Sequence, residues 1–268
     1  MDTASGELLH REEWNGGLVE IIASDGLRSL FFASRYLQSC MSPDHPEKLQ
    51  LSYTRYMLLG LPALESVRHI LIIGIGAGSL IHYCHHHYPE SIIDAVDNSP
   101  RIIALARRYF LLPENDRIRI HCTDGLAFLE ETTADRRYDL ILVDAFDHQG
   151  MAANIYSPPF FERCSAVLAD NGMLSCNLWS DDARLQATIR NSIVAYMEGH
   201  ISVSVPDRGN VVILAFRQPV PWERFQRSRE EWRELEARFG LDFRAMLKVA
   251  RHESRSLLQR LFPVFPWN

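Results

Sequence analysis

Two aspartates lie three positions apart directly after an apolar run, in the segment VDAFDHQG. The run at residues 140–143 is typical of a buried strand, and the acids are Asp144 and Asp147. Ligands of open α/β sheets bind beyond the carboxyl ends of strands, so this pair could take up a proton or hold a substrate cation. Two helix-capping aspartates are an alternative, whereas a calcium loop needs more oxygen ligands at regular spacing.

A glycine-rich loop follows an earlier apolar run, at residues 70–73. Gly74, Gly76 and Gly78 precede a predicted helix, and glycines there let the backbone turn tightly and approach a ligand. Ser79 occupies the place of the third glycine of GxGxxG, so the loop matches GxGxG better than the dinucleotide motif. A tight turn without a ligand is the alternative interpretation.

Two more acids end the next predicted strands. Asp97 comes 23 residues after Gly74 and is placed to accept both ribose hydroxyls of a nucleoside. Asp124, followed by Gly125, could accept the exocyclic amine of an adenine. Either acid alone is more often a solvated loop residue. Together, at successive strand ends, they favour an adenosine site.

The elements that must position these residues alternate between strand and helix. Apolar runs at 70–73, 92–96, 118–122, 140–143 and 173–177 predict a mainly parallel sheet with helices on both faces. Only five residues separate the runs at 200–205 and 211–216, too few for a parallel crossover, so these form an antiparallel hairpin. An antiparallel hairpin at the end of a seven-stranded Rossmann-like sheet is typical of the AdoMet-methyltransferase-like α/β fold.

The N-terminal part predicts a small separate β-sheet. Runs at 18–22, 30–32 and 36–38 alternate in the manner of strands, and Asp25-Gly26 is a strong hairpin-turn signal. A linking helix is predicted over 47–60, and a charged helical extension with Trp222, Phe225, Trp232, Leu235 and Phe239 packed on the domain follows residue 218. We therefore expect an N-terminal region at 1–66, a catalytic domain at 67–217 and a C-terminal extension at 218–268.

Composition narrows the function classes. A chain of 268 residues with a net charge of −6 and no basic stripe predicts no nucleic-acid partner. No apolar run approaches the roughly 20 residues of a membrane span, and five scattered cysteines suit reduced thiols, so we expect a cytoplasmic protein without a membrane partner. His82 and His86 share a helix face without an HExxH glutamate, and no metal site is predicted.

The segments LIIGIGAGS, AVDNSPRIIALARRYF, CTDGLAF and YDLILVDAFD, in this order, resemble the spermidine synthase (polyamine aminopropyltransferase) family over most of the chain. The resemblance implies a donor site for decarboxylated AdoMet, a co-substrate used in place of any permanently bound cofactor. That site would be formed by Gln38, Gly74, Gly76, Gly78, Asp97, Asp124 and Gly125. It also implies Asp144 as the catalytic aspartate, Asp147 as the second acid of its motif, and Tyr53 beside the reacting amine.

The chain departs from the family pattern at several positions. Ala77 replaces the usual acid of the glycine loop, His148 replaces a proline, and Thr54 and Arg55 follow Tyr53 where a glutamine or histidine and then an acid are common. We predict an aminopropyltransferase of polyamine biosynthesis with a small amine such as putrescine as acceptor, and a possible homodimer. An AdoMet-dependent methyltransferase, another AdoMet-using transferase and a non-catalytic nucleoside-binding homologue are the alternatives.

Overall fold

The computed structural model describes residues 6–14, 17–32, 36–133, 136–147, 150–151, 154–179, 183–206 and 208–250. A four-stranded antiparallel sheet opens the chain, in the order β1-β2-β3-β4. Its strands are β1 (Glu7–Trp14), β2 (Gly17–Ser24), β3 (Leu27–Phe32) and β4 (Tyr36–Met41). Asp25 and Gly26 both have positive φ, as the predicted tight hairpin turn requires. Strand β1 was not predicted, because its sequence ELLHREEW is polar.

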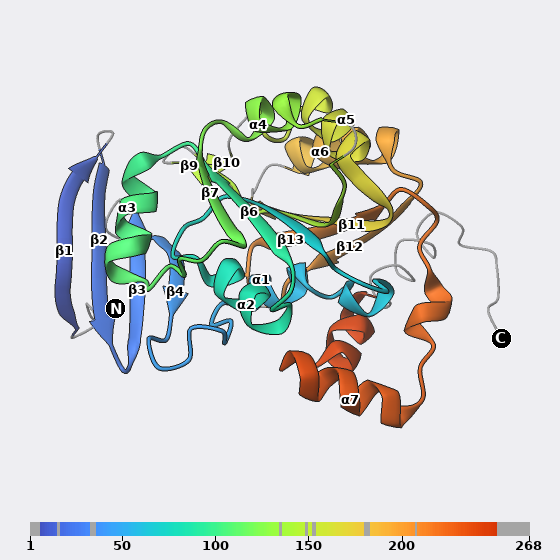
Figure 1. Cartoon of the computed structure of the whole chain (residues 1–268), viewed down its shortest axis with the longest axis horizontal. Coiled ribbons are helices and arrows are strands. Elements are labelled where there is room, and N and C mark those ends of the chain that lie inside the picture. Colours follow the sequence, from blue (N-terminus) through green and yellow to red (C-terminus); the bar gives the residue numbers. More distant parts are fainter. Residues whose placement is uncertain are drawn as a thin grey trace.

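The central sheet has the order β12-β13-β11-β8-β5-β6-β7 (Figure 1). Strands β11, β8, β5, β6 and β7 run parallel, while β13 pairs antiparallel with both β11 and β12. In chain order the strands are β5 (His69–Ile73), β6 (Ile92–Asp97), β7 (Ile118–Cys122), β8 (Tyr138–Val143), β11 (Leu168–Trp179), β12 (Gly199–Ser204) and β13 (Asn210–Phe216). The predicted methyltransferase-like sheet with a terminal antiparallel hairpin is confirmed.

Helices cover both faces of this sheet, as Figure 1 shows. One face carries α4 (Gly125–Glu131), α5 (Pro158–Val167) and α6 (Ala183–Tyr196). The other carries α1 (Ser52–Met57), α2 (Ser79–His87) and α7 (Arg229–Phe239), while α3 (Pro100–Tyr109) lies beside the N-terminal sheet. Three short elements complete the set: β9 (Phe146–Asp147), paired with β10 (Gly150–Met151), and the 3-10 turns η1 (Leu61–Ala63) and η2 (Trp222–Phe225).

The two-residue period of the strands divides the core into two halves. In β5, Ile70 and Ile72 pack with α1 and α2, whereas Leu71 and Ile73 pack under α4 and α5. Strands buried on both faces are continuous apolar runs, which is why the sequence predicted them well. A third cluster, which includes Ile21 of the N-terminal sheet, joins that sheet to α3.

Two helical predictions need correction. The linking helix predicted over 47–60 is only α1, because the residues before Ser52 form turns in which the buried Leu49 and Leu51 pack without helical geometry. In the C-terminal extension Phe225, Trp232 and Phe239 are buried as expected, but Trp222 is 41% exposed. The predicted domain boundaries at 66/67 and 217/218 stay predictions.

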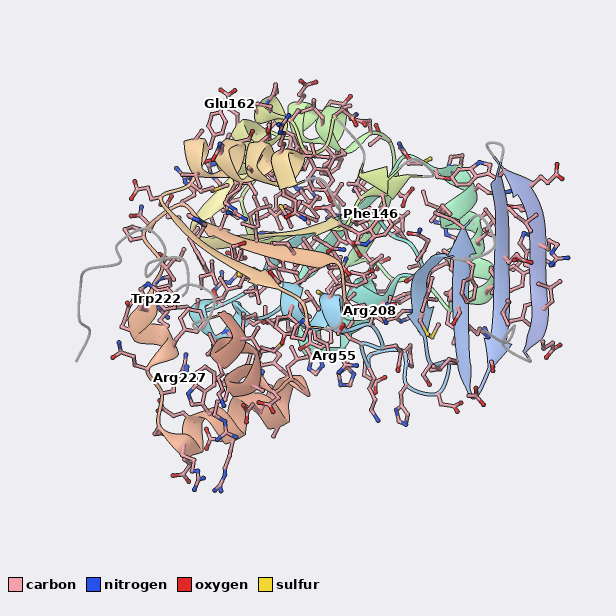
Figure 2. The ribbon with its side chains drawn as sticks, turned by 180° about the vertical axis from the view of Figure 1, so that it is seen from behind. Arg55, Phe146, Glu162, Arg208, Trp222 and Arg227 are labelled. Carbon is pink, nitrogen blue, oxygen red and sulfur yellow. The ribbon has the colours of Figure 1, made fainter. Side chains whose placement is uncertain are left out.

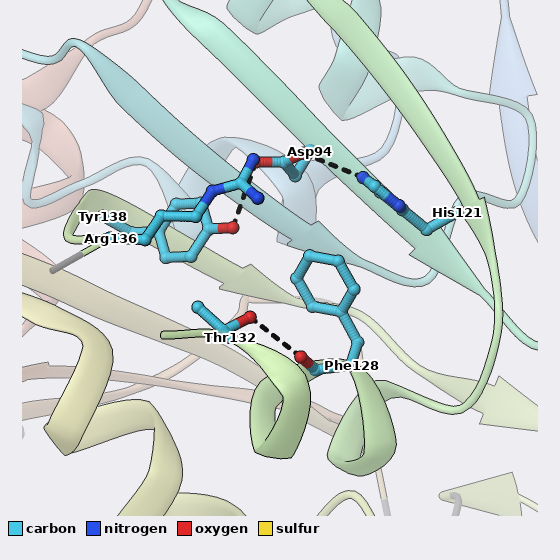
Figure 3. Close-up of polar contacts among 6 residues, drawn as sticks. All are labelled: Asp94, His121, Phe128, Thr132, Arg136 and Tyr138. Carbon is cyan, nitrogen blue, oxygen red and sulfur yellow. Dashed lines mark hydrogen bonds and ion pairs between the residues drawn. The ribbon is translucent and has the colours of Figure 1, made fainter. Parts of the chain in front are cut away.

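A buried charge cluster lies on the sheet face near α4, away from the predicted site (Figure 3). Asp94 of β6 is fully buried and accepts hydrogen bonds from Tyr138 Oη at 3.0 Å and from the Arg136 guanidinium, while His121 Nε2 lies 2.8 Å from its other oxygen. A buried carboxylate requires such partners, because an unpaired charge inside a protein is costly. The cluster therefore has a structural role in joining β6, β7 and β8.

Candidate active site

A cavity of about 520 Å³ lies at the carboxyl ends of the parallel strands, where the N-terminal sheet meets the central sheet. Most of the predicted site residues line it: Gln38, Tyr53, Gly74, Gly76, Asp97, Asp124, Gly125 and Asp144. Gly78 does not line it. The side chain of Asp147 lies outside the described part of the chain. Residues separated by more than 100 positions in the sequence thus meet around one space.

The glycine loop allows two backbones to approach closely. Gly74 has φ +93°, and a Cβ placed on it would lie 2.1 Å from the carbonyl oxygen of Asp144. Its amide donates to Val96 O at 2.8 Å, and the amide of Asp144 donates to Ile73 O at 2.8 Å. Only glycine fits this position, because any side chain would push the loop away from Asp144.

Gly78 has a different role from the other loop glycines. It precedes α2 with φ +75°, and a Cβ there would lie 2.8 Å from the side chain of Leu112. Within the same loop, Ala77 is fully buried against the N-terminal sheet and α3, and it does not line the cavity. This half of the loop therefore serves packing, and Gly76 and Gly74 face the space.

Asp97 ends β6 with both carboxylate oxygens bound to main-chain amides. Oδ2 accepts from Ile75 N and Oδ1 accepts from Ser99 N, each at 2.9 Å. Burial raises the pKa of Asp97, and these backbone hydrogen bonds oppose the rise. Each oxygen keeps a further lone pair, so the carboxylate that fixes the glycine loop can still accept from a ligand hydroxyl.

Asp124 caps helix α4 while it lines the cavity. Its Oδ1 accepts from Leu126 N at 2.9 Å and from Ala127 N at 3.2 Å. Its Oδ2 accepts from Asn154 Nδ2 at 2.6 Å. The capping role and the binding role are compatible, since capping occupies Oδ1 and leaves part of Oδ2 for an amine.

Asp144 follows β8 near the middle of the sheet edge and is held by side chains. Its Oδ2 accepts from Tyr53 Oη at 3.1 Å, and its Oδ1 accepts from Asn177 Nδ2 at 2.8 Å. Burial raises the pKa of Asp144, while the Asn177 and Tyr53 hydrogen bonds lower it. Burial and the neighbouring Asp144 carboxylate raise the pKa of Tyr53, so this phenol stays a donor at physiological pH.

A second layer of side chains extends this network toward the β12–β13 hairpin. Asn210 donates to Asn177 Oδ1 at 3.0 Å, and Tyr156 Oη donates to the Asn177 carbonyl at 2.8 Å. Asn177 and Trp179, near the carboxyl end of β11, also line the cavity. Arg208 and Asn210 line the cavity and were missed. The signal for them was their position at a carboxyl-end hairpin beside the last parallel strand.

Two other features suggested by the sequence lie away from the cavity. Arg55 does not line it: its guanidinium donates to the carbonyls of Leu49 and Gln50, both at 3.0 Å. His82 Nε2 lies 2.8 Å from the carbonyl of Phe110, which accounts for its burial in α2. The arginine that bears on the site is therefore Arg208 and not Arg55.

The fold and the site define the class of AdoMet-methyltransferase-like transferases, with an adenosine-compatible edge leading to the half-buried carboxylate of Asp144. The family model for the spermine/spermidine synthase domain matches residues 51–206. The polyamine aminopropyltransferase of Chromobacterium violaceum is 36% identical to this chain, over 84% of this chain and 86% of that protein. The chain belongs to the spermine/spermidine synthase family. The predicted family is thereby confirmed, and membership supports the predicted aminopropyl transfer.

Two further comparisons extend the picture. A probable spermidine synthase from Corynebacterium glutamicum has the same fold, with a TM-score of 0.69, 21% identity and 81% of each chain covered. A mouse eEF1A lysine and N-terminal methyltransferase is 30% identical over 47% of this chain and 19% of its own length. Among the described residues, none of the helices combines the length and apolarity needed to cross a membrane.

Proposed function

We propose that the protein transfers an aminopropyl group from decarboxylated AdoMet to a small amine and releases methylthioadenosine. The observation that carries this proposal is the position of Asp144. It lies half-buried between the acids that follow β6 and β7 on one side and the polar groups of β11 and β13 on the other. A donor bound along the first side would end at Asp144, and an amine could reach it from the second side.

The reaction is a displacement at carbon. The lone pair of the neutral amine forms the new C–N bond while the C–S bond breaks, and its electron pair leaves with the sulfur of methylthioadenosine. Because the amine arrives protonated and the product nitrogen is again cationic, a proton must leave the nitrogen. Asp144 is suited to orient the amine and accept this proton, since burial raises the pKa of Asp144 and makes it a stronger base than an exposed aspartate.

The donor end has complementary roles for the remaining acids. Asp97 would accept from the ribose hydroxyls, Asp124 from the adenine amine, and Gln38 would contact the nucleoside from β4. Tyr53 would hold Asp144 in place by donating to its Oδ2. Asp147 is proposed as an acceptor for a substrate ammonium on the strength of the family motif alone.

The direct test is turnover. The purified protein is incubated with decarboxylated AdoMet and a panel of primary amines that includes putrescine, and methylthioadenosine is quantified by chromatography. We expect amine-dependent methylthioadenosine formation that is lost in Asp144→Asn. No methylthioadenosine with any amine would overturn the proposal.

A methyl transfer from AdoMet is the second candidate, because Ala77 replaces the usual acid of the glycine loop and the mouse methyltransferase is a partial relative. Calorimetric titration with AdoMet and with its decarboxylated form separates the two. A pocket for aminopropyl transfer should bind the decarboxylated form at least tenfold more tightly. Preference for AdoMet would support the methyltransferase instead.

A further inference from the structure

Two asparagine side chains form a chain of hydrogen bonds from the β12–β13 hairpin to Asp144. Asn210, the first residue of β13, donates to Asn177 Oδ1 at 3.0 Å, and Asn177 of β11 donates to Asp144 Oδ1 at 2.8 Å. Figure 2 labels Arg208, two positions before Asn210, on the side of the central sheet that faces the N-terminal sheet. Asn210 lines the cavity, whereas Asn177 is only 1% exposed. The hydrogen bonds therefore join a residue at the cavity edge to the proposed base.

The carboxylate of Asp144 fixes the direction of these hydrogen bonds. An ionised carboxylate can only accept hydrogen bonds, so the Asn177 amide must present its nitrogen to Asp144. The group that faces the Asn177 amide oxygen must then be a donor. Asn210 supplies this donor through its Nδ2. Both amides therefore donate toward Asp144, and reversing either one breaks the series.

The main chain around Asn177 is held by contacts that do not involve its amide group. Asn177 is paired with Val212 of β13 in the sheet, and its carbonyl accepts from Tyr156 Oη at 2.8 Å. Burial raises the pKa of Tyr156 well above its usual value, and a backbone hydrogen bond from Ala145 opposes the rise, so this phenol stays a donor. The freedom that remains to Asn177 is rotation of its amide about the terminal torsion, which has a broad, roughly two-fold preference.

Reversing the Asn177 amide would reverse its effect on the base. Burial raises the pKa of Asp144, and the hydrogen bond from Asn177 opposes this rise. With the amide turned round, its oxygen would face the carboxylate, and only protonated Asp144 could then donate to it. The pKa of Asp144 would therefore rise further. The orientation of this neutral side chain thus affects the pH range in which Asp144 can accept a proton.

We propose that Asn210 is a positioning residue for the aminopropyl transfer: it holds the Asn177 amide in the orientation that directs an N–H at Asp144. The inference rests on the proposed function. It adds a residue that acts on the proposed base through another side chain. Loss of Asn210 would leave Asn177 in place and let its amide reverse.

The other charged and titratable groups around Asp144 remain unchanged in the test. Tyr53 of α1 donates to its Oδ2, and the buried Tyr156 lies close enough to interact with its charge. The charged side chains that line the cavity with Asp144, among the described residues, are Asp97, Asp124 and Arg208. Four further acids have side chains outside the described part of the chain and are kept in every variant: Asp147, Asp181, Asp182 and Asp207.

The test is a double-mutant cycle with Asn177→Leu and Asn210→Leu. Leucine keeps the branched shape of asparagine without its polar atoms. The pH dependence of kcat/KM is measured with decarboxylated AdoMet and putrescine. Each single variant should move the acid limb to higher pH and lower kcat/KM on that limb about tenfold, the scale of one hydrogen bond to a charged group. The double variant should match Asn177→Leu, because Asn210 acts through Asn177. Additive shifts would overturn the inference.

Asn210→Asp gives a second way to turn the Asn177 amide. A carboxylate at this position requires the nitrogen of Asn177, so the amide oxygen must face Asp144. The acid limb should move further than in Asn210→Leu, and part of this move should be lost in the Asn177→Leu background. A move of the same size in both backgrounds would be a direct effect of the added charge and would contradict the role of Asn210.

Asn115→Leu is the matched control, since it makes the same substitution at an exposed asparagine outside the cavity lining, whose side chain accepts from Arg117 N at 2.9 Å. It should leave the acid limb in place. Thermal unfolding checks that each variant is folded. An acid limb that does not move in folded Asn210→Leu would overturn the inference and leave the proposed function standing.

A titration without turnover keeps the two proposals separable. The protein is labelled with aspartate that carries 13C in its side-chain carboxyl group, and the NMR signal of Asp144 is assigned by its loss in Asp144→Asn. The titration midpoint of this signal should rise in Asn210→Leu and in Asn177→Leu, with no further rise in the double variant. This result without any methylthioadenosine formation would uphold the orienting role of Asn210 while the transfer reaction fails. A midpoint that Asn210→Leu leaves unchanged would refute it.

Discussion

The two ends of the cavity hold their acids in different ways. At the proposed donor end, Asp97 and Asp124 each accept two hydrogen bonds from main-chain amides, and Asp124 accepts one more from the side chain of Asn154. At the proposed amine end, Asp144 accepts from two side chains, Tyr53 and Asn177, which lie 91 and 33 positions away in the sequence. Main-chain amides are present whatever the side chains are, so the donor end survives most substitutions. The amine end can be rebuilt by changing a few distant residues.

The same contrast appears in what sets the pKa of each aspartate. Burial raises the pKa of both Asp97 and Asp144. Backbone hydrogen bonds oppose the rise at Asp97, whereas the hydrogen bonds of Asn177 and Tyr53 oppose it at Asp144. The basicity of Asp144 is therefore open to tuning by mutation, and that of Asp97 is tied to the loop itself.

The largest expected effect isolates the amine end. Asp144→Asn removes the proposed proton acceptor but keeps the size of the side chain, and general-base catalysis is typically worth 10²–10⁴-fold, so we expect kcat to fall about 10³-fold. Methylthioadenosine should still bind within twofold of the wild type by calorimetry, because the donor end is untouched. A variant that keeps more than a tenth of the wild-type kcat would contradict the role of Asp144.

A smaller effect, with the opposite signature, is expected from Asp97→Asn. The amide nitrogen would face either Ile75 N or Ser99 N and leave one of these donors unpaired. The cost is about 1–3 kcal/mol, which corresponds to a rise of roughly 5- to 150-fold in donor KM. The acceptor KM should stay within twofold. Asp116→Asn, an exposed acid outside the cavity lining, is the control. An equal rise in the donor KM and the acceptor KM would contradict the assignment of Asp97 to the donor end alone.

Tyr53→Phe tests whether side chains set the basicity of Asp144. Loss of the phenol donor raises the pKa of Asp144 further, so the acid limb of the kcat/KM–pH profile should move to higher pH. At the optimum we expect a loss of about tenfold, the scale of one hydrogen bond to a charged group.

Tyr138→Phe is the matched control for that change, because Tyr138 donates to the buried Asp94 at 3.0 Å in the cluster away from the cavity (Figure 3). It should lower thermal stability without moving the acid limb. If both variants move the acid limb of the kcat/KM–pH profile by the same amount, the effect of Tyr53→Phe is a general structural one. The role of Tyr53 in setting the pKa of Asp144 would then be contradicted.

The meeting of Asp97, Asp124 and the glycine loop around one cavity could be predicted from the sequence, and so could the sheet that carries them. Buried parallel strands are continuous apolar runs, and each of them is followed within one or two residues by the loop that serves the site. The five residues between the last two runs were enough to require an antiparallel hairpin. Strand β1 was not predicted, because it is a polar edge strand held by backbone pairing with β2.

The residues of the amine end were harder to predict from the sequence, because they become neighbours only after folding. Arg55 was considered because it lies two positions after Tyr53. Residues two apart on a helix point in different directions. The Arg55 guanidinium instead donates to the carbonyls of Leu49 and Gln50. Arg208 belongs to a turn whose sequence, VPDRGN, carries no chemical motif. Its proximity to Tyr53 depends on the pairing of β13 with β11, which no local pattern records.

The smallest expected effect comes from the packing of the hairpin turn on Trp179. Gly209 has no positive φ, but a Cβ there would lie 3.0 Å from Trp179 Nε1, so Gly209→Ala must displace the indole slightly. We expect the acceptor KM to rise about threefold, within the range of a mild packing change, with donor KM unchanged and a shift in tryptophan fluorescence. Gly17→Ala is the control, since its Cβ would make only an ordinary 3.7 Å contact. A change in donor KM instead would mean that the hairpin acts on both ends of the cavity, and that the amine end is less independent than its side-chain contacts imply.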